Sequence, residues 1–191
     1  VRYADDFVCA FQYQDDAERF YKVLGKRLEK FGLSLAEDKT RMIRFGRFKT
    51  EDNKRFDFLG FEYSWRKDRR QRPLVKLRTS RKKYKASLKN VSDRCKKNRH
   101  LKVTDLFKKL NAKRRGYYNY YGVIGNFESL SDFFWHTKKI LFKWLNRRSQ
   151  RKSYTREGFV ELLKFFRIEK PRITEKKKQI QFSLFDALQS A

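Results

Sequence analysis

Two adjacent aspartates near the start of the chain, Asp5 and Asp6, are the residues whose type and spacing point most directly to chemistry. Short β-prone runs flank them, Arg2-Tyr3 before and Phe7 to Phe11 after, so a β-hairpin with the acids at its tip is predicted. Carboxylates held next to each other repel unless cations lie beside them, and a tight turn keeps them in one orientation. The pair therefore indicates a divalent-metal site, and a solvated turn is the alternative interpretation.

The charge of the chain is concentrated in its second part. Lys+Arg 50 against Asp+Glu 22 gives the 191 residues a net charge of +28, of which residues 1–48 contribute +2 and residues 49–191 contribute +26. A surplus of this size is typical of nucleic-acid binding, because each basic side chain that neutralises a phosphate releases counterions. A ribosomal-type or membrane-surface basic protein is the alternative. Membrane binding fits less well, since basic and aromatic residues alternate throughout this part instead of forming one amphipathic helix.

Composition excludes several classes of protein. The chain is 39% hydrophobic with only Gly 8 and Pro 2, which is typical of a folded protein. Two cysteines and two histidines are too few for a disulfide framework or a structural zinc site, so zinc-finger and HNH-type nuclease modules are not expected. No apolar run approaches the roughly 20 residues of a membrane-spanning helix, and the start does not resemble a signal peptide. We therefore expect a soluble intracellular protein without a membrane partner.

The elements that must position the aspartates follow from periodicity, which predicts an α+β fold with a boundary near residue 79. Apolar residues at helical spacing from Asp15 to Phe31, followed by Gly32, predict a helix. A small antiparallel sheet is predicted from residues 33–35, 40–45, 56–61 and 74–77. Beyond this point the period changes from 2 to 3.6, and helices are predicted to begin near Ser80, at Thr104 or Asp105, at Ser131 and at Thr155.

Four sequence boxes resemble one family when they are taken in order. Tyr3-Ala4-Asp5-Asp6 resembles the YADD box of reverse transcriptases, and the segment from Gly32 to Thr40 resembles their "G-L-x-L-x-x-E-K-T" segment. Phe58-Leu59-Gly60-Phe61 resembles the FLGF segment that grips the primer. The run from Lys113 to Tyr121 resembles the R-G-W/Y-x-N-Y-Y motif of domain X, the thumb of group II intron reverse transcriptase/maturases. Tyr117 stands where that family more often has Trp.

This resemblance implies a domain organisation and a mechanism. Residues 1–79 would be a truncated reverse transcriptase palm, residues 80–170 a helical thumb/maturase bundle, and residues 171–191 a basic tail. Two Mg²⁺ ions, held by Asp5 and Asp6, would serve nucleotidyl transfer from dNTP to the primer. In this family a third carboxylate and the fingers lie upstream of the hairpin, so the chain by itself is expected not to polymerise.

The resemblance also implies substrate-contacting residues. Those expected near primer or dNTP are Tyr3, Ala4, Lys39, Leu59 and Gly60; a solvated surface lysine is the alternative for Lys39. Those expected to bind intron RNA are Lys113, Arg114, Arg115, Tyr118 and Asn119. Helical spacing favours Tyr117, together with Tyr120 or Tyr121, as core residues. Tyr118 and Asn119 are then the better candidates for contact with RNA. The implied partners are intron and template RNA, a DNA primer or target and dNTP, in the bacterial cytoplasm.

A last segment lies in the tail, where Gln181-Phe182-Ser183-Leu184-Phe185 resembles the pentapeptide by which bacterial DNA enzymes bind the sliding clamp. Gln181, Leu184 and Phe185 would make that contact in a preformed apolar pocket. The alternative is that these apolar side chains pack the tail onto the thumb.

Two hypotheses of different classes remain. In the first, the chain is part of an RNA-directed DNA polymerase and maturase, borne by an intron or attached to a defence system. In the second, it is a non-catalytic RNA-binding maturase module that assists splicing, and the acidic hairpin is vestigial.

Overall fold

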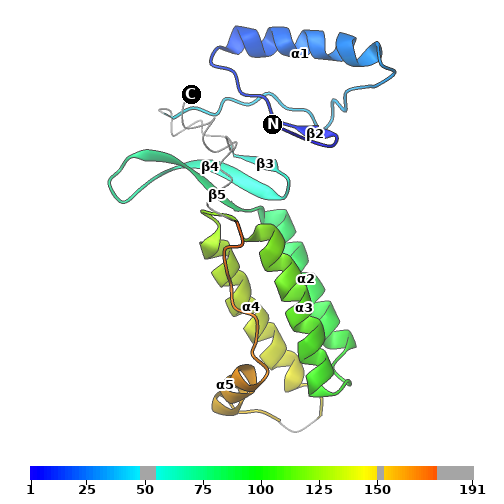
Figure 1. Ribbon diagram of the computed structural model, residues 1–191, viewed down its shortest axis with the longest axis vertical. Coiled ribbons are helices and arrows are strands. Elements are labelled where there is room, and N and C mark those ends of the chain that lie inside the picture. Colours follow the sequence, from blue (N-terminus) through cyan, green and yellow to red (C-terminus); the bar gives the residue numbers. More distant parts are fainter. Residues whose placement is uncertain (48–54, 150–152, 176–191) are drawn as a thin grey trace. The chain divides into compact units, whose positions relative to one another are not determined.

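The computed structural model describes residues 1–47, 55–149 and 153–175 (Figure 1). Its elements, in chain order, are β1 (Arg2–Tyr3), β2 (Asp6–Phe7), α1 (Gln14–Glu29), β3 (Phe56–Phe58), β4 (Phe61–Lys67), β5 (Pro73–Thr79), α2 (Arg81–Lys97), α3 (Val103–Tyr121), α4 (Phe127–Leu145) and α5 (Arg156–Phe165). The predicted α+β class is confirmed. Among the described residues, one compact unit contains 1–59 and 63–76, and a second contains 60–62 and 77–175.

The first unit contains the acidic hairpin and α1. Strands β1 and β2 pair antiparallel, with Arg2 opposite Phe7 and Tyr3 opposite Asp6. The predicted helix is confirmed as α1, whose first turn carries acids and whose last turn carries bases, as the helix dipole favours. The strands predicted at 33–35 and 40–45 are wrong. Residues 36–40 instead form a turn in which the amides of Lys39 and Thr40 both donate to the Ala36 carbonyl.

Strands β3, β4 and β5 form a three-stranded antiparallel sheet in that order. Its side chains alternate between the two faces, so that alternate positions of β5 are buried. Phe58, Trp65 and Val75 form a buried cluster against which Phe45 and other partly buried residues pack. The ring of Phe45 lies 5.7 Å from that of Trp65, which attaches the segment before the sheet to its core.

The second unit is a helical bundle in which α2, α3 and α4 run alongside one another (Figure 1). Its core includes Leu106, Phe107, Leu110, Tyr117 and Tyr118 from α3 and Leu130, Phe133, Leu141 and Leu145 from α4, and α2 and α5 also contribute buried residues. Helices α2 and α5 begin as predicted, directly after Ser80 and Thr155. The hydroxyl of Thr155 accepts a hydrogen bond of 3.1 Å from the amide of Gly158.

Two predicted helix starts are wrong. Helix α3 begins after Lys102, and α4 begins after Asn126 instead of at Ser131. Tertiary contacts fix the second start. The side-chain amide of Asn126 is buried. Its oxygen accepts a hydrogen bond of 2.8 Å from the backbone N–H of Thr79, and its nitrogen donates one of 2.8 Å to the Tyr121 carbonyl. These two bonds join the end of β5 to the α3–α4 turn. A local capping rule cannot detect a partner 47 positions away.

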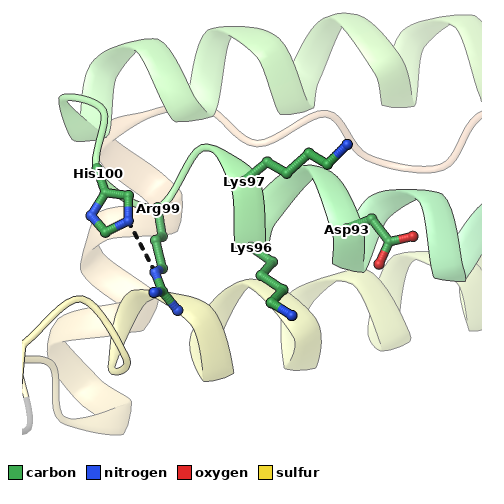
Figure 2. Close-up of a pocket in the computed structure, with 5 residues that line it drawn as sticks. All are labelled: Asp93, Lys96, Lys97, Arg99 and His100. Carbon is green, nitrogen blue, oxygen red and sulfur yellow. Dashed lines mark hydrogen bonds between the residues drawn. The ribbon is translucent and has the colours of Figure 1, made fainter.

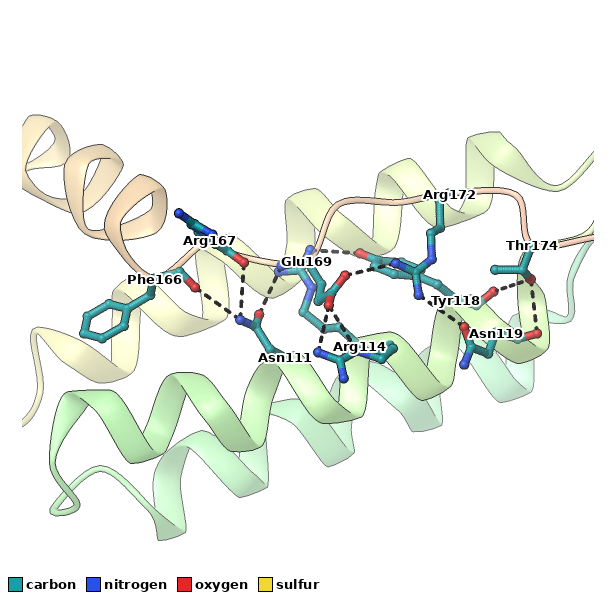
Figure 3. Close-up of polar contacts among 10 residues, drawn as sticks. Asn111, Arg114, Tyr118, Asn119, Phe166, Arg167, Glu169, Arg172 and Thr174 are labelled. Carbon is teal, nitrogen blue, oxygen red and sulfur yellow. Dashed lines mark hydrogen bonds and ion pairs between the residues drawn. The ribbon is translucent and has the colours of Figure 1, made fainter.

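After α5 the chain returns along α3, and we call residues 166–175 the return segment (Figure 3). Asn111 of α3 donates to the Phe166 carbonyl at 3.3 Å and accepts from the Glu169 amide at 3.1 Å. At the other end the Thr174 amide donates to the Gly122 carbonyl at 2.7 Å. None of the helices in the described residues is long and apolar enough to cross a membrane.

Candidate functional site

The acidic hairpin is a two-residue turn that presents both carboxylates to solvent. Ala4 and Asp5 form the turn, Ala4 has the left-handed φ of 50°, and Asp6 is the first residue of β2. The guanidinium of Arg2 donates to the Ala4 carbonyl at 2.9 Å. All five residues from Arg2 to Asp6 are exposed, so the turn holds the acids in place while leaving them accessible.

Two neighbouring carboxylates provide the hard oxygen donors that Mg²⁺ prefers, and their exposure leaves room for its remaining water ligands. Asp5 and Asp6 therefore fit a divalent cation chemically. Within residues 1–47, 55–149 and 153–175, no group of three or more His, Cys, Asp or Glu side chains is placed to hold a metal ion. Two carboxylates are fewer donors than the coordination shell of a divalent cation contains.

Lys39 is exposed in the turn that follows α1. The described structure shows no hydrogen bond or ion pair between Lys39 and either hairpin aspartate. Lys39 and the two hairpin aspartates therefore lie on separate segments of the first unit.

The two residues of the FLGF box that connect β3 to β4 have left-handed backbone conformations. Leu59 has a φ of 49° and Gly60 a φ of 78°, as a two-residue hairpin turn with matching twist requires. Such a φ is strained for a bulky residue, and the strain is tolerated here because Leu59 packs against the cluster of Phe58, Trp65 and Val75. A Cβ atom at Gly60 would lie 3.1 Å from the Tyr121 hydroxyl oxygen. A larger residue at position 60 would therefore force the turn or the Tyr121 side chain to shift.

Three of the residues expected to bind RNA are wholly or partly accessible and have protein partners. The ammonium of Lys113 donates to the Asn90 side chain, and partial burial lowers the pKa of Lys113. The guanidinium of Arg115 lies 3.0 Å from the Glu169 carboxylate. Asn119 accepts from Arg172 at 3.4 Å (Figure 3).

The other two expected RNA contacts are buried, so their prediction as surface residues is wrong. Arg114 and Tyr118 are each 0% exposed, whereas Tyr120 is 56% exposed. The Arg114 guanidinium donates to the Tyr118 hydroxyl at 2.8 Å and lies 4.5 Å from the centre of the Phe134 ring. Burial lowers the pKa of Arg114 and raises that of Tyr118. The reason is that α3 is covered by both α4 and the return segment, so its buried face is wider than one apolar stripe.

Basic side chains gather at the end of α2, where Lys96, Lys97, Arg99 and His100, with Asp93, line an open depression of about 400 Å³ (Figure 2). The Arg99 guanidinium donates to the His100 ring at 3.2 Å. The depression lies in the part of the chain whose surplus of positive charge indicated nucleic-acid binding, but the sequence did not predict that these residues form one depression. Gln181, Leu184 and Phe185 lie outside the described residues.

Two parts of the chain match known families. Residues 1–63 match the family described as reverse transcriptase (RNA-dependent DNA polymerase), and residues 81–160 match the group II intron, maturase-specific domain. No curated protein and no solved structure matches the chain. The reverse transcriptase match contains the acidic hairpin and Lys39, and the maturase match contains Lys113 to Asn119. Because these two domains follow one another in a single polypeptide, the chain belongs to the group II intron reverse transcriptase/maturases.

Proposed function

We propose that this chain acts as part of an RNA-directed DNA polymerase and maturase, in which the acidic hairpin serves nucleotidyl transfer and the helical unit binds intron RNA. The observation that carries the proposal is the order of the two matched domains, with an exposed pair of carboxylates in the polymerase match. We assign residues 1–79 to the palm, 80–170 to the thumb and 171–191 to a basic tail.

Asp5 and Asp6 are the proposed ligands of two Mg²⁺ ions, with a third carboxylate that the described residues do not bring to them. A bound divalent cation would polarise the phosphate and stabilise the charge that develops in an in-line displacement. The hairpin holds Tyr3 and Ala4 next to the acids. These two residues are the proposed contacts of the primer end. Lys39 binds the triphosphate of dNTP, and the Leu59-Gly60 turn supports the primer backbone.

The helical unit is the proposed RNA-binding part. Most of the net charge lies in residues 49–191, and phosphates are the partner that such a surface attracts. Lys113, Arg115 and Asn119 are the proposed contacts on α3, together with the basic depression at the end of α2. Arg114 and Tyr118 act from the interior by fixing α3 against α4.

Removing two positive charges from the basic depression is expected to weaken RNA binding and its salt dependence. In Lys96→Gln/Lys97→Gln, the slope of log K against log salt should fall by about two, since each lysine neutralises one phosphate. Lys22→Gln/Lys26→Gln on α1 is the matched control, because both pairs are exposed on a helix and lower the net charge equally. Filter binding of intron RNA at several salt concentrations measures both slopes. Equal slopes for the two variants would contradict a phosphate site at the end of α2.

We also propose that the tail binds the bacterial sliding clamp through Gln181, Leu184 and Phe185. The double variant Leu184→Ala/Phe185→Ala should remove binding to purified clamp, because two apolar anchors of the pocket are lost. Surface plasmon resonance measures this, with Phe182→Ala as the control. Clamp binding that is absent from the unaltered chain, or unchanged in the double variant, rules out the contact.

A further inference from the structure

The exposed indole of Trp135 is a feature of the helical unit that RNA binding through lysine and arginine does not explain. Trp135 lies in the middle of α4 with 56% of its surface exposed, whereas Trp65 and Trp144 are 8% and 9% exposed. A large aromatic ring left in water forgoes the stabilisation that burial would give. Its position on a well-formed helix shows that the ring does not owe its exposure to a loose chain end.

Charged side chains are sorted on either side of this ring. The acids of α4, Glu128 and Asp132, precede Trp135, and its lysines follow. The ammonium of Lys138 lies 4.4 Å from the centre of the indole, and Lys139 is the next residue. An aromatic face and positive charge are therefore available together on the C-terminal side of Trp135, and this combination complements the base and phosphate of a nucleotide.

Neighbouring side chains also hold the Trp135 ring in place. Phe134 meets Trp135 edge-on with ring centres 6.4 Å apart, and the ammonium of Lys138 lies 5.3 Å from the Phe134 ring. On its inner side Phe134 is covered by the guanidinium of Arg114, which is hydrogen-bonded to Tyr118 in the bundle interior. Arg114 is thus a positioning residue that links the buried core to the surface ring. A ring held in this way loses little further freedom on binding.

We propose that Trp135 and Lys138 form a binding site for an unpaired base of RNA, in which the base stacks on the indole and the adjoining phosphate contacts the ammonium. An unpaired base exposes the face that stacking needs, whereas a base inside a helix has both faces covered. Lys138 and Lys139 favour nucleic acid over an apolar protein segment. This inference rests on the proposed RNA binding and adds which part of the RNA is recognised and by which residue.

Tryptophan fluorescence provides a direct test on the 191-residue chain. Because Trp135 is exposed and the other two indoles are buried, an unpaired oligoribonucleotide should quench mainly its emission, and a fully paired RNA of equal length should not. Trp135→Phe should abolish the quenching yet keep most of the affinity, since phenylalanine also stacks. Trp135→Ala should weaken the binding of unpaired RNA about tenfold and leave the affinity for paired RNA unchanged. Phe165→Ala, which removes a 78% exposed ring on α5, is the control and should change neither the quenching nor the affinity for RNA.

The outcomes separate this site from the proposed function. The stacking site is overturned if unpaired RNA leaves the tryptophan emission unchanged, or if Trp135→Ala weakens the binding of paired and unpaired RNA equally. In either case the proposed RNA binding stands. Failure of the unaltered chain to bind either RNA overturns the proposed function and this inference together. The quenching measurement on the unaltered chain and on Trp135→Phe remains decisive if Trp135→Ala does not fold.

Discussion

Replacing Asp5 or Asp6 by asparagine is expected to lower Mg²⁺-dependent primer extension on an RNA template by on the order of 10³-fold. Asparagine keeps the shape of the side chain but removes the negative charge that holds a cation. Charge stabilisation by a metal at the transferred phosphate contributes several kcal/mol, and each 1.36 kcal/mol corresponds to about tenfold in rate. Extension is measured with radiolabelled primer on a polypeptide that also carries the third carboxylate and the fingers of the family, since extension is not expected of the 191-residue chain alone.

A second pair of adjacent aspartates provides a matched control. Asp15 and Asp16 lie in the first turn of α1, are exposed, and have the same charge. Asp15→Asn/Asp16→Asn should retain extension. A readout independent of activity uses Fe²⁺ in place of Mg²⁺, which should cleave the backbone near residues 5 and 6 only when these aspartates are intact. Extension that survives in both Asp5→Asn and Asp6→Asn would contradict their assignment as metal ligands. Absence of extension in the unaltered polypeptide would favour the alternative of an RNA-binding maturase with a vestigial polymerase site.

Gly122→Ala is expected to destabilise the helical unit by about 2–3 kcal/mol, because the new methyl group has no space. Its Cβ would overlap the Tyr118 carbonyl oxygen and lie 2.7 Å from the Thr174 hydroxyl and 2.8 Å from the Arg172 carbonyl oxygen. Since Gly122 has a φ of −78°, the effect is steric and not a matter of backbone conformation. Thermal unfolding followed by circular dichroism should show a melting temperature lower by roughly 10 °C.

Gly116→Ala is the control within the same helix and should have the opposite sign. A Cβ at Gly116 would meet nothing within 4 Å, and alanine is favoured over glycine in a helix by about 0.8–1 kcal/mol. The helical unit of this variant should therefore melt at a higher temperature. A neutral Gly122→Ala would show that the return segment is not packed at Gly122 as described.

The sequence predicted the elements that local pattern determines and missed those determined by distant contacts. The hairpin, α1 and α5 carry their own turn, charge and capping signals, and all three are present. The second strand of the hairpin is only Asp6–Phe7, shorter than the predicted run to Phe11. The start of α4 depends on Asn126, whose partner Thr79 is 47 positions away. The strand predicted at 40–45 has an apolar pattern, but Phe45 packs on the sheet core as coil.

The same distinction applies to the site. Spacing identified Asp5 and Asp6 as an exposed pair, because the turn that exposes them is encoded by its own neighbours. It did not identify Arg114 and Tyr118 as interior residues, because an arginine within a basic run gives no sign that α4 and the return segment cover it. The partners of such a residue come from other elements, so burial of this kind follows only from the assembled bundle.

The return segment has a consequence for the order of events during protein synthesis. The hydroxyl of Thr174 contacts the Gly122 carbonyl, 52 residues earlier in the chain. Helices α3 and α4 can therefore pair while translation is still in progress. The contact between Thr174 and Gly122 cannot form until Thr174 has left the ribosome. Within the described bundle, the return segment is then the last layer to form. Apart from Phe166, which stacks on Phe107, and the buried Ile168, its residues are mostly polar or exposed. The amide hydrogens of residues 169–175 should therefore exchange early in the finished protein.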